Sequence, residues 1–218
     1  MSILLIGIIG VTALVSYMGF TNVQVFEKYK FNVSAIVQKK EYIRLLSAGF
    51  LHADWMHFFF NMLTLYFFGP IVAQAFGEMG LLVVYFGSIL LGNLFSLYLY
   101  QHQGWYSAIG ASGGVSGILF AAIAVYPQIG IYFFFIPIPI PGYIFGLLYF
   151  SYSVYMMLNP KAHDNIGHAA HLGGAFLGLI YSIMLMPQLA LTNWRYLLIM
   201  AIPLLYLCFE IFVRKKKF

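Results

Sequence analysis

The feature that most constrains this chain is a series of apolar segments, each long enough to cross a lipid bilayer as a helix. The hydrocarbon core of a bilayer is ~30 Å thick, and an α-helix needs about 20 apolar residues to span it. We therefore predict an all-α fold, a polytopic bundle of membrane helices. The sequence predicts seven such helices, at residues 3–19, 56–76, 80–100, 112–127, 142–158, 168–186 and 194–213.

Composition excludes most other classes of protein. Only 8% of the 218 residues are charged and 62% are hydrophobic, whereas soluble domains carry ~25% charged residues. The single cysteine, Cys208, excludes a disulfide within the chain. The net charge of +5 comes largely from residues 28–44 and 214–217, which suits the head groups of a lipid bilayer better than nucleic acid. We expect residues 1–218 to form one membrane domain.

Two stretches interrupt the apolar pattern. Residues 20–55 carry several charges among apolar residues, and we expect a partly helical loop lying on the membrane surface. Residues 127–142 contain Ile-Pro-Ile-Pro-Ile-Pro at 136–141, where every second residue lacks an N–H group. Because such a segment cannot continue a helix, it predicts a hairpin between two spans.

Polar side chains inside predicted spans are costly in lipid and therefore mark candidate functional sites. His57 and Asn61 are four residues apart, which places both on one face of a helix, where two donors can converge on a single acceptor. The alternative is an interhelical hydrogen-bond pair. His52, near the helix start, is interpreted as a loop or capping residue.

A glycine-rich stretch at 110–117 opens the fourth predicted span and contains Ser112. A serine at a helix N-terminus lies among unpaired N–H groups that favour a developing negative charge, which suits a nucleophile. The alternative is an N-capping serine followed by a packing stripe, since Gly113 and Gly117 have the spacing that lets another helix approach closely.

The sixth predicted span opens with His168 and His171, followed by Gly174 and Gly178 at the same close-packing spacing. Tight packing of this helix on the fourth would bring an imidazole to Ser112. Histidine is the side chain best suited to take a proton from serine at neutral pH, and His171 is the preferred candidate because it lies closer to the glycines.

Metal binding was the other possible use of these histidines. An i, i+3 histidine pair together with His163 is compatible with a bound ion, but Asp164 is the only nearby carboxylate and no H-E-x-x-H motif occurs. We expect neither a metal nor another cofactor.

The ordered combination of these motifs resembles the rhomboid family of intramembrane serine proteases. It consists of His52-x4-His57-x3-Asn61, then Gly-Ala-Ser-Gly at 110–113, then Ala-His-Leu-Gly-Gly at 170–174. The resemblance covers roughly residues 1–186 and implies a six-helix rhomboid-like core, with 194–213 as an extra C-terminal helix. It implies that Ser112 is the nucleophile and His171 the general base of a catalytic dyad. It also implies an oxyanion hole formed by His57, Asn61 and the backbone N–H of Ser112.

Three departures from the family pattern affect supporting residues only. Arg44 is not part of the Trp-Arg pair that many members carry in the first loop, and Ala73 occupies the usual position of a glutamate. Ser116 replaces a tyrosine that stacks on the base in some members. We therefore expect another aromatic residue, such as Tyr152 or Tyr155, to hold His171.

The resemblance implies hydrolysis of peptide bonds in transmembrane protein substrates, in a multi-pass protein of the bacterial cell membrane. Two alternatives remain open. One is a non-catalytic rhomboid-like protein that binds and escorts membrane proteins. The other is a small transporter that uses its histidines as a proton relay.

Overall fold

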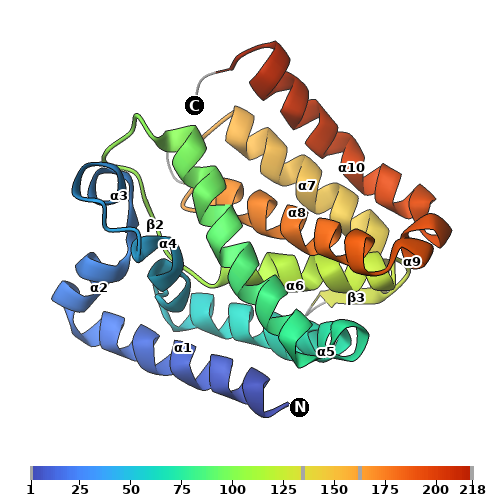
Figure 1. Cartoon of the computed structure of the whole chain (residues 1–218), viewed down its shortest axis with the longest axis horizontal. Helices are drawn as coiled ribbons and strands as arrows, with labels where there is room; N and C mark the ends of the chain where they lie inside the picture. Colours follow the sequence, from blue (N-terminus) through green and yellow to red (C-terminus); the bar gives the residue numbers. More distant parts are fainter. Residues whose placement is uncertain (1, 134–135, 162–163, 217–218) are drawn as a thin grey trace.

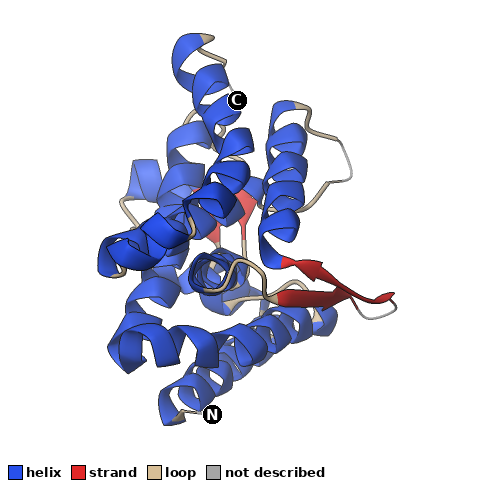
Figure 2. Ribbon diagram, turned by 90° about the vertical axis from the view of Figure 1, so that its right-hand side faces the viewer, coloured by secondary structure: helices blue, strands red, loops and turns tan. Residues whose placement is uncertain are grey.

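The computed structural model describes residues 2–133, 136–161 and 164–216. Most of them lie in helices that pack side by side into a bundle (Figure 1 and Figure 2). The helices are α1 (Ile3–Thr21), α2 (Val23–Tyr29), α3 (Val33–Lys39), α4 (Arg44–Ser47), α5 (Trp55–Tyr100), α6 (Ser112–Val125), α7 (Gly142–Leu158), α8 (His168–Leu185), α9 (Pro187–Thr192) and α10 (Trp194–Cys208). The predicted helical membrane bundle is confirmed.

Short strands are an addition that the all-α prediction missed. They form two antiparallel pairs, β1 (Phe31–Asn32) with β2 (Ser107–Ala108), and β3 (Gly130–Phe133) with β4 (Ile136–Pro141). The second pair is the hairpin predicted from the proline repeat, except that Phe134 and Phe135 lie outside the described residues. In β4 the prolines alternate with isoleucines, so the missing N–H groups can all lie on the unpaired edge of the strand.

Several helices have the length and composition of membrane spans. α1, α5, α8 and the segment Trp194–Val213, which is α10 continued by a π-helical turn, are all apolar and long enough to cross a bilayer. α6 and α7 are shorter apolar helices. These helices account for the predicted spans at their positions in the sequence.

α5 contains two of the predicted spans, 56–76 and 80–100, without a loop between them. The chain bends at Gly77, whose φ of 75° and ψ of 173° lie outside the helical region. Glycine adopts this conformation at little cost because it has no Cβ. Figure 1 shows the two halves of α5 running in clearly different directions. The second half of α5 thereby comes to lie against α6 and α8.

α6 forms the centre of the bundle. Every residue from Gly113 to Val125 is buried, and in Figure 1 α6 passes behind α8 and beside α5. A Cβ on Gly174 of α8 would collide with the carbonyl oxygen of Gly113, and one on Gly178 would collide with that of Gly117. The two helices therefore touch backbone to backbone.

α7 and α10 form a peripheral pair beside this centre (Figure 1). They run in the same direction, because Tyr143 near the start of α7 packs on Tyr196 near the start of α10, with ring centroids 4.8 Å apart. At their other ends, Lys216 Nζ donates a hydrogen bond to the carbonyl oxygen of Leu158 (2.6 Å). Lys216 thus lies at the same end of the bundle as the start of α8.

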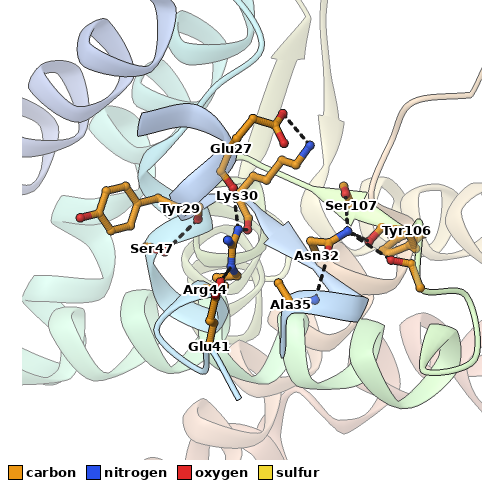
Figure 3. Close-up of polar contacts among 11 residues, drawn as sticks. Glu27, Tyr29, Lys30, Asn32, Ala35, Glu41, Arg44, Ser47, Tyr106 and Ser107 are labelled. Carbon is orange, nitrogen blue, oxygen red and sulfur yellow. Dashed lines mark hydrogen bonds and ion pairs between the residues drawn. The ribbon is translucent and has the colours of Figure 1, made fainter. Parts of the chain in front are cut away.

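The loop between α1 and α5 is held by Arg44 (Figure 3). Arg44 is only 8% exposed. Its Nε donates to the Glu41 carboxylate (2.6 Å), and its Nη1 donates to the carbonyl oxygens of Glu27 (2.7 Å) and Lys30 (2.8 Å). Charge-assisted hydrogen bonds of this kind are stronger than neutral ones. Arg44 therefore joins α4 to the end of α2. It does so without the adjacent tryptophan of the Trp-Arg pair mentioned above.

Asn32 joins the same loop to the segment that precedes α6. Its Nδ2 donates to Ser107 Oγ (3.1 Å) and to the carbonyl oxygen of Gly104 (3.2 Å), while its Oδ1 caps α3 by accepting from Ala35 N (2.9 Å; Figure 3). Because β1 also pairs with β2, the 101–111 segment is fixed on a scaffold formed by the first loop.

His52 connects three parts of the chain just in front of α6. Ser16 Oγ lies 2.8 Å from His52 Nδ1 and donates to the carbonyl oxygen of Phe50 (2.9 Å), so His52 Nδ1–H donates to Ser16. His52 Nε2 then accepts from the N–H of Ala111 (3.3 Å). This neutral tautomer satisfies every group in the chain of hydrogen bonds. The predicted loop histidine is thus a buried structural link.

We predict that Arg44→Ala lowers the free energy of unfolding in detergent by about 3 kcal/mol. The reason is that the change leaves two partly buried carbonyl oxygens and a carboxylate without their charged donor. The matched control is Lys39→Ala at an exposed residue of the same loop, which should change stability by no more than about 0.5 kcal/mol. Equal thermal stability of the two variants would contradict this role for Arg44.

A second prediction concerns acid. Burial, with a smaller contribution from neighbouring His57, lowers the pKa of His52 from 6.5 to about 3. Below pH 6.5 the unfolded chain binds a proton at this residue that the folded chain does not, so stability falls as the pH falls. We expect a loss of about 2 kcal/mol between pH 6.5 and 4.5 from this residue. His52→Leu should have a lower melting temperature at pH 7 and a weaker dependence on acid, and parallel pH curves would refute the assignment.

Candidate active site

Ser112 and His171 meet at the centre of the bundle. Ser112 is the first residue of α6 and His171 lies in the first turn of α8. Their side chains are 2.6 Å apart between Oγ and Nε2, a short hydrogen bond. The backbone contact of Gly113 with Gly174 lies one turn or less from both residues and makes this approach possible. Both side chains are only partly exposed.

Gly110 shapes the turn that presents Ser112. Its φ of +122° is strained for any residue with a Cβ. A Cβ built here would also lie 2.9 Å from His57 Nε2 and 3.5 Å from Ser112 Oγ. The imidazole of His57 and the hydroxyl of Ser112 therefore both border the backbone of Gly110. Its N–H donates to the carbonyl oxygen of Ala48 (3.0 Å), which anchors the turn.

His57 is oriented by the start of α5. Asp54 caps this helix and accepts from the N–H of His57 (2.7 Å). The N–H of Ala53 lies 3.5 Å from His57 Nδ1, at the limit of a hydrogen bond. With Nδ1 as the acceptor, the proton of the neutral ring is on Nε2, the atom that borders Gly110. His57 thereby presents a donor beside Ser112.

Asn61 lies one helical turn further along α5. It is 7% exposed, and its Nδ2 donates to the carbonyl oxygen of His57 (2.9 Å). Of the four side chains singled out from the sequence, the structure brings Ser112, His171 and His57 together. Asn61 is held on the same face of α5 as His57, with its amide bonded within its own helix.

His168 has a different partner from His171. Its Nε2 lies 3.0 Å from Asp164 Oδ2, and its buried Nδ1 has no partner among the described residues. Its ring packs edge-on against that of Tyr152, with centroids 5.5 Å apart. The structure therefore places His171, rather than His168, beside Ser112.

The aromatic residue beside His171 is Tyr149, where the sequence suggested Tyr152 or Tyr155. The rings of Tyr149 and His171 are nearly parallel, at 23°, with centroids 6.3 Å apart. Tyr155 is 55% exposed on the outer side of α7. The three tyrosines recur every third residue along α7, and local sequence alone does not show which of them reaches the site.

Within the described residues, no three His, Cys, Asp or Glu side chains lie together in a group that could hold a metal ion. His163, one member of the histidine set considered from the sequence, lies outside the described residues. His168 and His171 are occupied by different partners, Asp164 and Ser112.

Two hollows lie at this end of the bundle. Ser112 lines a narrow cavity of about 20 Å³, room for about one water molecule, together with residues from the preceding turn, the second half of α5 and the start of α8. A larger hollow of about 600 Å³ is lined by Trp105, Met157, Asp164 and His168, while neither Ser112 nor His171 lines it. The site combines a hydroxyl, a base within hydrogen-bond distance of it and backbone N–H donors at a helix N-terminus. Nucleophilic acyl transfer uses these three kinds of group.

Comparison with known proteins identifies the family. Residues 39–188 match the family model described as the rhomboid domain. The matched region contains every residue of the site described above.

Similar proteins come from plants, yeast and bacteria. The RHOMBOID-like protein 12, mitochondrial, of Arabidopsis thaliana is 32% identical over 62% of this chain and 44% of its own length. The Rhomboid protein 1, mitochondrial, of Saccharomyces cerevisiae is 28% identical over 70% of this chain and 46% of its own. The putative rhomboid protease YdcA of Bacillus subtilis is 27% identical over 68% of this chain and 69% of its own. This chain thus spans about half the length of the first two.

The names of the relatives include both a putative protease and an inactive protein, the inactive RHOMBOID-like protein 8 of Arabidopsis thaliana. Family membership is therefore compatible with catalysis and with its absence. The match over residues 39–188, the apolar helices and the relatives agree on one conclusion: this chain is a multi-pass integral membrane protein and belongs to the rhomboid family.

Proposed function

We propose that this rhomboid-family protein is an intramembrane serine protease that hydrolyses peptide bonds in or near the transmembrane segments of other proteins. The observation that carries the proposal is the 2.6 Å hydrogen bond between Ser112 Oγ and His171 Nε2. A serine hydroxyl is a weak nucleophile until a base within this distance takes its proton. The presence of both residues supports the proposal over a purely binding role.

In the proposed first step, Ser112 Oγ attacks the scissile carbonyl carbon while His171 Nε2 takes the hydroxyl proton. The carbonyl oxygen becomes an oxyanion, stabilised by the N–H of Ser112 at the start of α6 and by His57 Nε2–H. Asn61 joins them if its amide turns from the carbonyl oxygen of His57 to the substrate. Fixed donors of this kind contribute about 3–4 kcal/mol each in the better measured cases.

The intermediate then collapses. The C–N bond breaks, His171 gives its proton to the leaving amine, and an acyl-enzyme ester remains on Ser112. A water molecule, deprotonated by His171, attacks the ester carbonyl, and the proton returns to Ser112 as the new carboxyl group leaves. The small cavity at Ser112 supports access of water, and the larger hollow lined by His168 supports the approach of peptide from this end of the bundle.

Substrates should carry residues that weaken a helix near the scissile bond. A peptide must be extended for attack, and a helix in lipid resists this because its freed N–H and C=O groups would be unpaired. Gly or Pro near the cleaved bond lowers that cost. As the compartment we propose the bacterial cell membrane, on the ground that the Bacillus subtilis relative is matched over similar shares of both chains.

We predict that a fluorophosphonate probe labels the detergent-solubilised protein at Ser112 and that Ser112→Ala abolishes the labelling. Ser116→Ala, four residues along the same helix, is the control and should still be labelled. Labelling is read by in-gel fluorescence and the site by mass spectrometry. Absence of labelling in folded wild-type protein would favour the binding role, and labelling in Ser112→Ala would remove the nucleophile assignment. A transporter predicts no covalent chemistry at Ser112.

We further predict that the polar residues differ in their kinetic effects on cleavage of a transmembrane substrate. His171→Ala should abolish cleavage as thoroughly as Ser112→Ala, and the double variant should be no worse, because the two act as one unit. Asn61→Ala should slow cleavage by about 10²-fold, since other donors remain. His168→Ala should retain activity. An active His171→Ala with an inactive His168→Ala would show that the wrong histidine was assigned.

A further inference from the structure

Tyr149 joins a peripheral helix to the proposed base. It projects from α7 and lies nearly parallel to the imidazole of His171, with centroids 6.3 Å apart, within the range of offset-stacked rings. Its hydroxyl oxygen is 2.8 Å from Ser116 Oγ. Ser116 is 5% exposed and lies one turn after Ser112 on α6. The phenol ring is thus fixed at its far end to the helix that carries the nucleophile.

Neighbouring aromatic rings hold Tyr149 in this position. Phe120, a further turn along α6, has its ring centroid 5.3 Å from that of Tyr149. Phe120 in turn stacks on Phe150 at 4.2 Å and 19°, and both phenylalanines are fully buried. With its hydroxyl bonded and its ring packed on Phe120, Tyr149 has little freedom to leave the face of His171.

The imidazole of His171 lacks the support that a carboxylate gives to a catalytic histidine elsewhere. In the described part of the chain, the hydrogen bond of this ring is to Ser112, and the nearby carboxylate of Asp164 binds His168 instead. A general base must be held in one orientation to take a proton efficiently, which is the usual task of the carboxylate. The ring of Tyr149 is the described group whose face lies along that of His171.

We infer that Tyr149 is a positioning residue for His171, that Ser116 fixes Tyr149, and that the reactivity of Ser112 depends on how α7 is seated against α6. This inference rests on the proposed function of the Ser112–His171 pair. The fold supports the dependence on α7. Gly146, one turn before Tyr149, is pressed between Phe120 and Met200 of α10. α10 therefore packs behind the turn of α7 that carries the tyrosine, and outward displacement of α7 takes the ring away from His171.

The test compares Tyr149→Leu, Tyr149→Phe and the matched control Tyr155→Leu, which removes an exposed tyrosine from the same helix. The measurements are the second-order rate constant of fluorophosphonate labelling, kcat and KM for a transmembrane peptide, and the melting temperature. We expect Tyr149→Leu to lower the labelling rate and kcat by about 3- to 10-fold with KM unchanged, because this factor corresponds to the interaction free energy of one aromatic ring pair. Tyr149→Phe keeps the ring and should recover most of the rate, and Tyr155→Leu should match the wild type.

Ser116→Ala tests the anchor and should lower the labelling rate by about 2-fold. If Tyr149→Leu is not folded by its melting curve, Tyr149→Met replaces it, because methionine fills a similar space without a ring. Equal labelling rates of Tyr149→Leu or Tyr149→Met and Tyr155→Leu would overturn the inference and leave the proposed protease intact. A rise in KM alone would likewise overturn it, since that result assigns Tyr149 to substrate binding. Failure of the wild type to react would instead remove the proposed function.

Discussion

The contact on which the site depends is the direct approach of two helix backbones, α6 and α8. Gly174 and Gly178 lie against the carbonyl oxygens of Gly113 and Gly117, where a Cβ would collide. In lipid, apolar side chains gain little by leaving their surroundings for one another, so close packing between small residues is a main source of helix association. The same contact brings the first turns of both helices together, and Ser112 and His171 occupy those turns.

Polar side chains in the loops complete what the helix contact begins. Arg44 and Asn32 fix the first loop to itself and to the 101–111 segment, while His52 accepts from the N–H of Ala111 immediately before Ser112. Each of these side chains is buried or half-buried. Each forms hydrogen bonds with backbone groups of the loops, which have no partners in a helix or a β-sheet. Since a buried unpaired carbonyl or N–H costs more than a typical hydrogen bond returns, the positions of Gly110 and Ser112 follow from these few interactions.

The group that lies along the face of His171 is an aromatic ring from a third helix. No carboxylate hydrogen-bonds to His171 among the described residues, and Asp164, the acid closest in sequence, serves His168. The ring of Tyr149 lies along the imidazole instead, and its hydroxyl is hydrogen-bonded to Ser116 on α6, the helix that begins with Ser112. The site is therefore built from three helices: α6 and α8 carry Ser112 and His171, and α7 carries the ring that lies along His171.

The apolar segments and the order of the polar motifs were readable from the sequence because both are local. A membrane span is recognised by about 20 consecutive apolar residues. His57, Ser112 and His171 are recognised because polar residues are rare in such segments. The bend at Gly77 that joins two spans, the pairing of Asp164 with His168, the structural use of His52 and the choice of Tyr149 over Tyr152 and Tyr155 were decided by tertiary structure. Each of them depends on the rotation of a helix about its axis or on a partner distant in the chain. Tyrosines that recur every third residue have the same local sequence signal, and only the packing of α7 against Phe120 and Ser116 determines which of them faces His171.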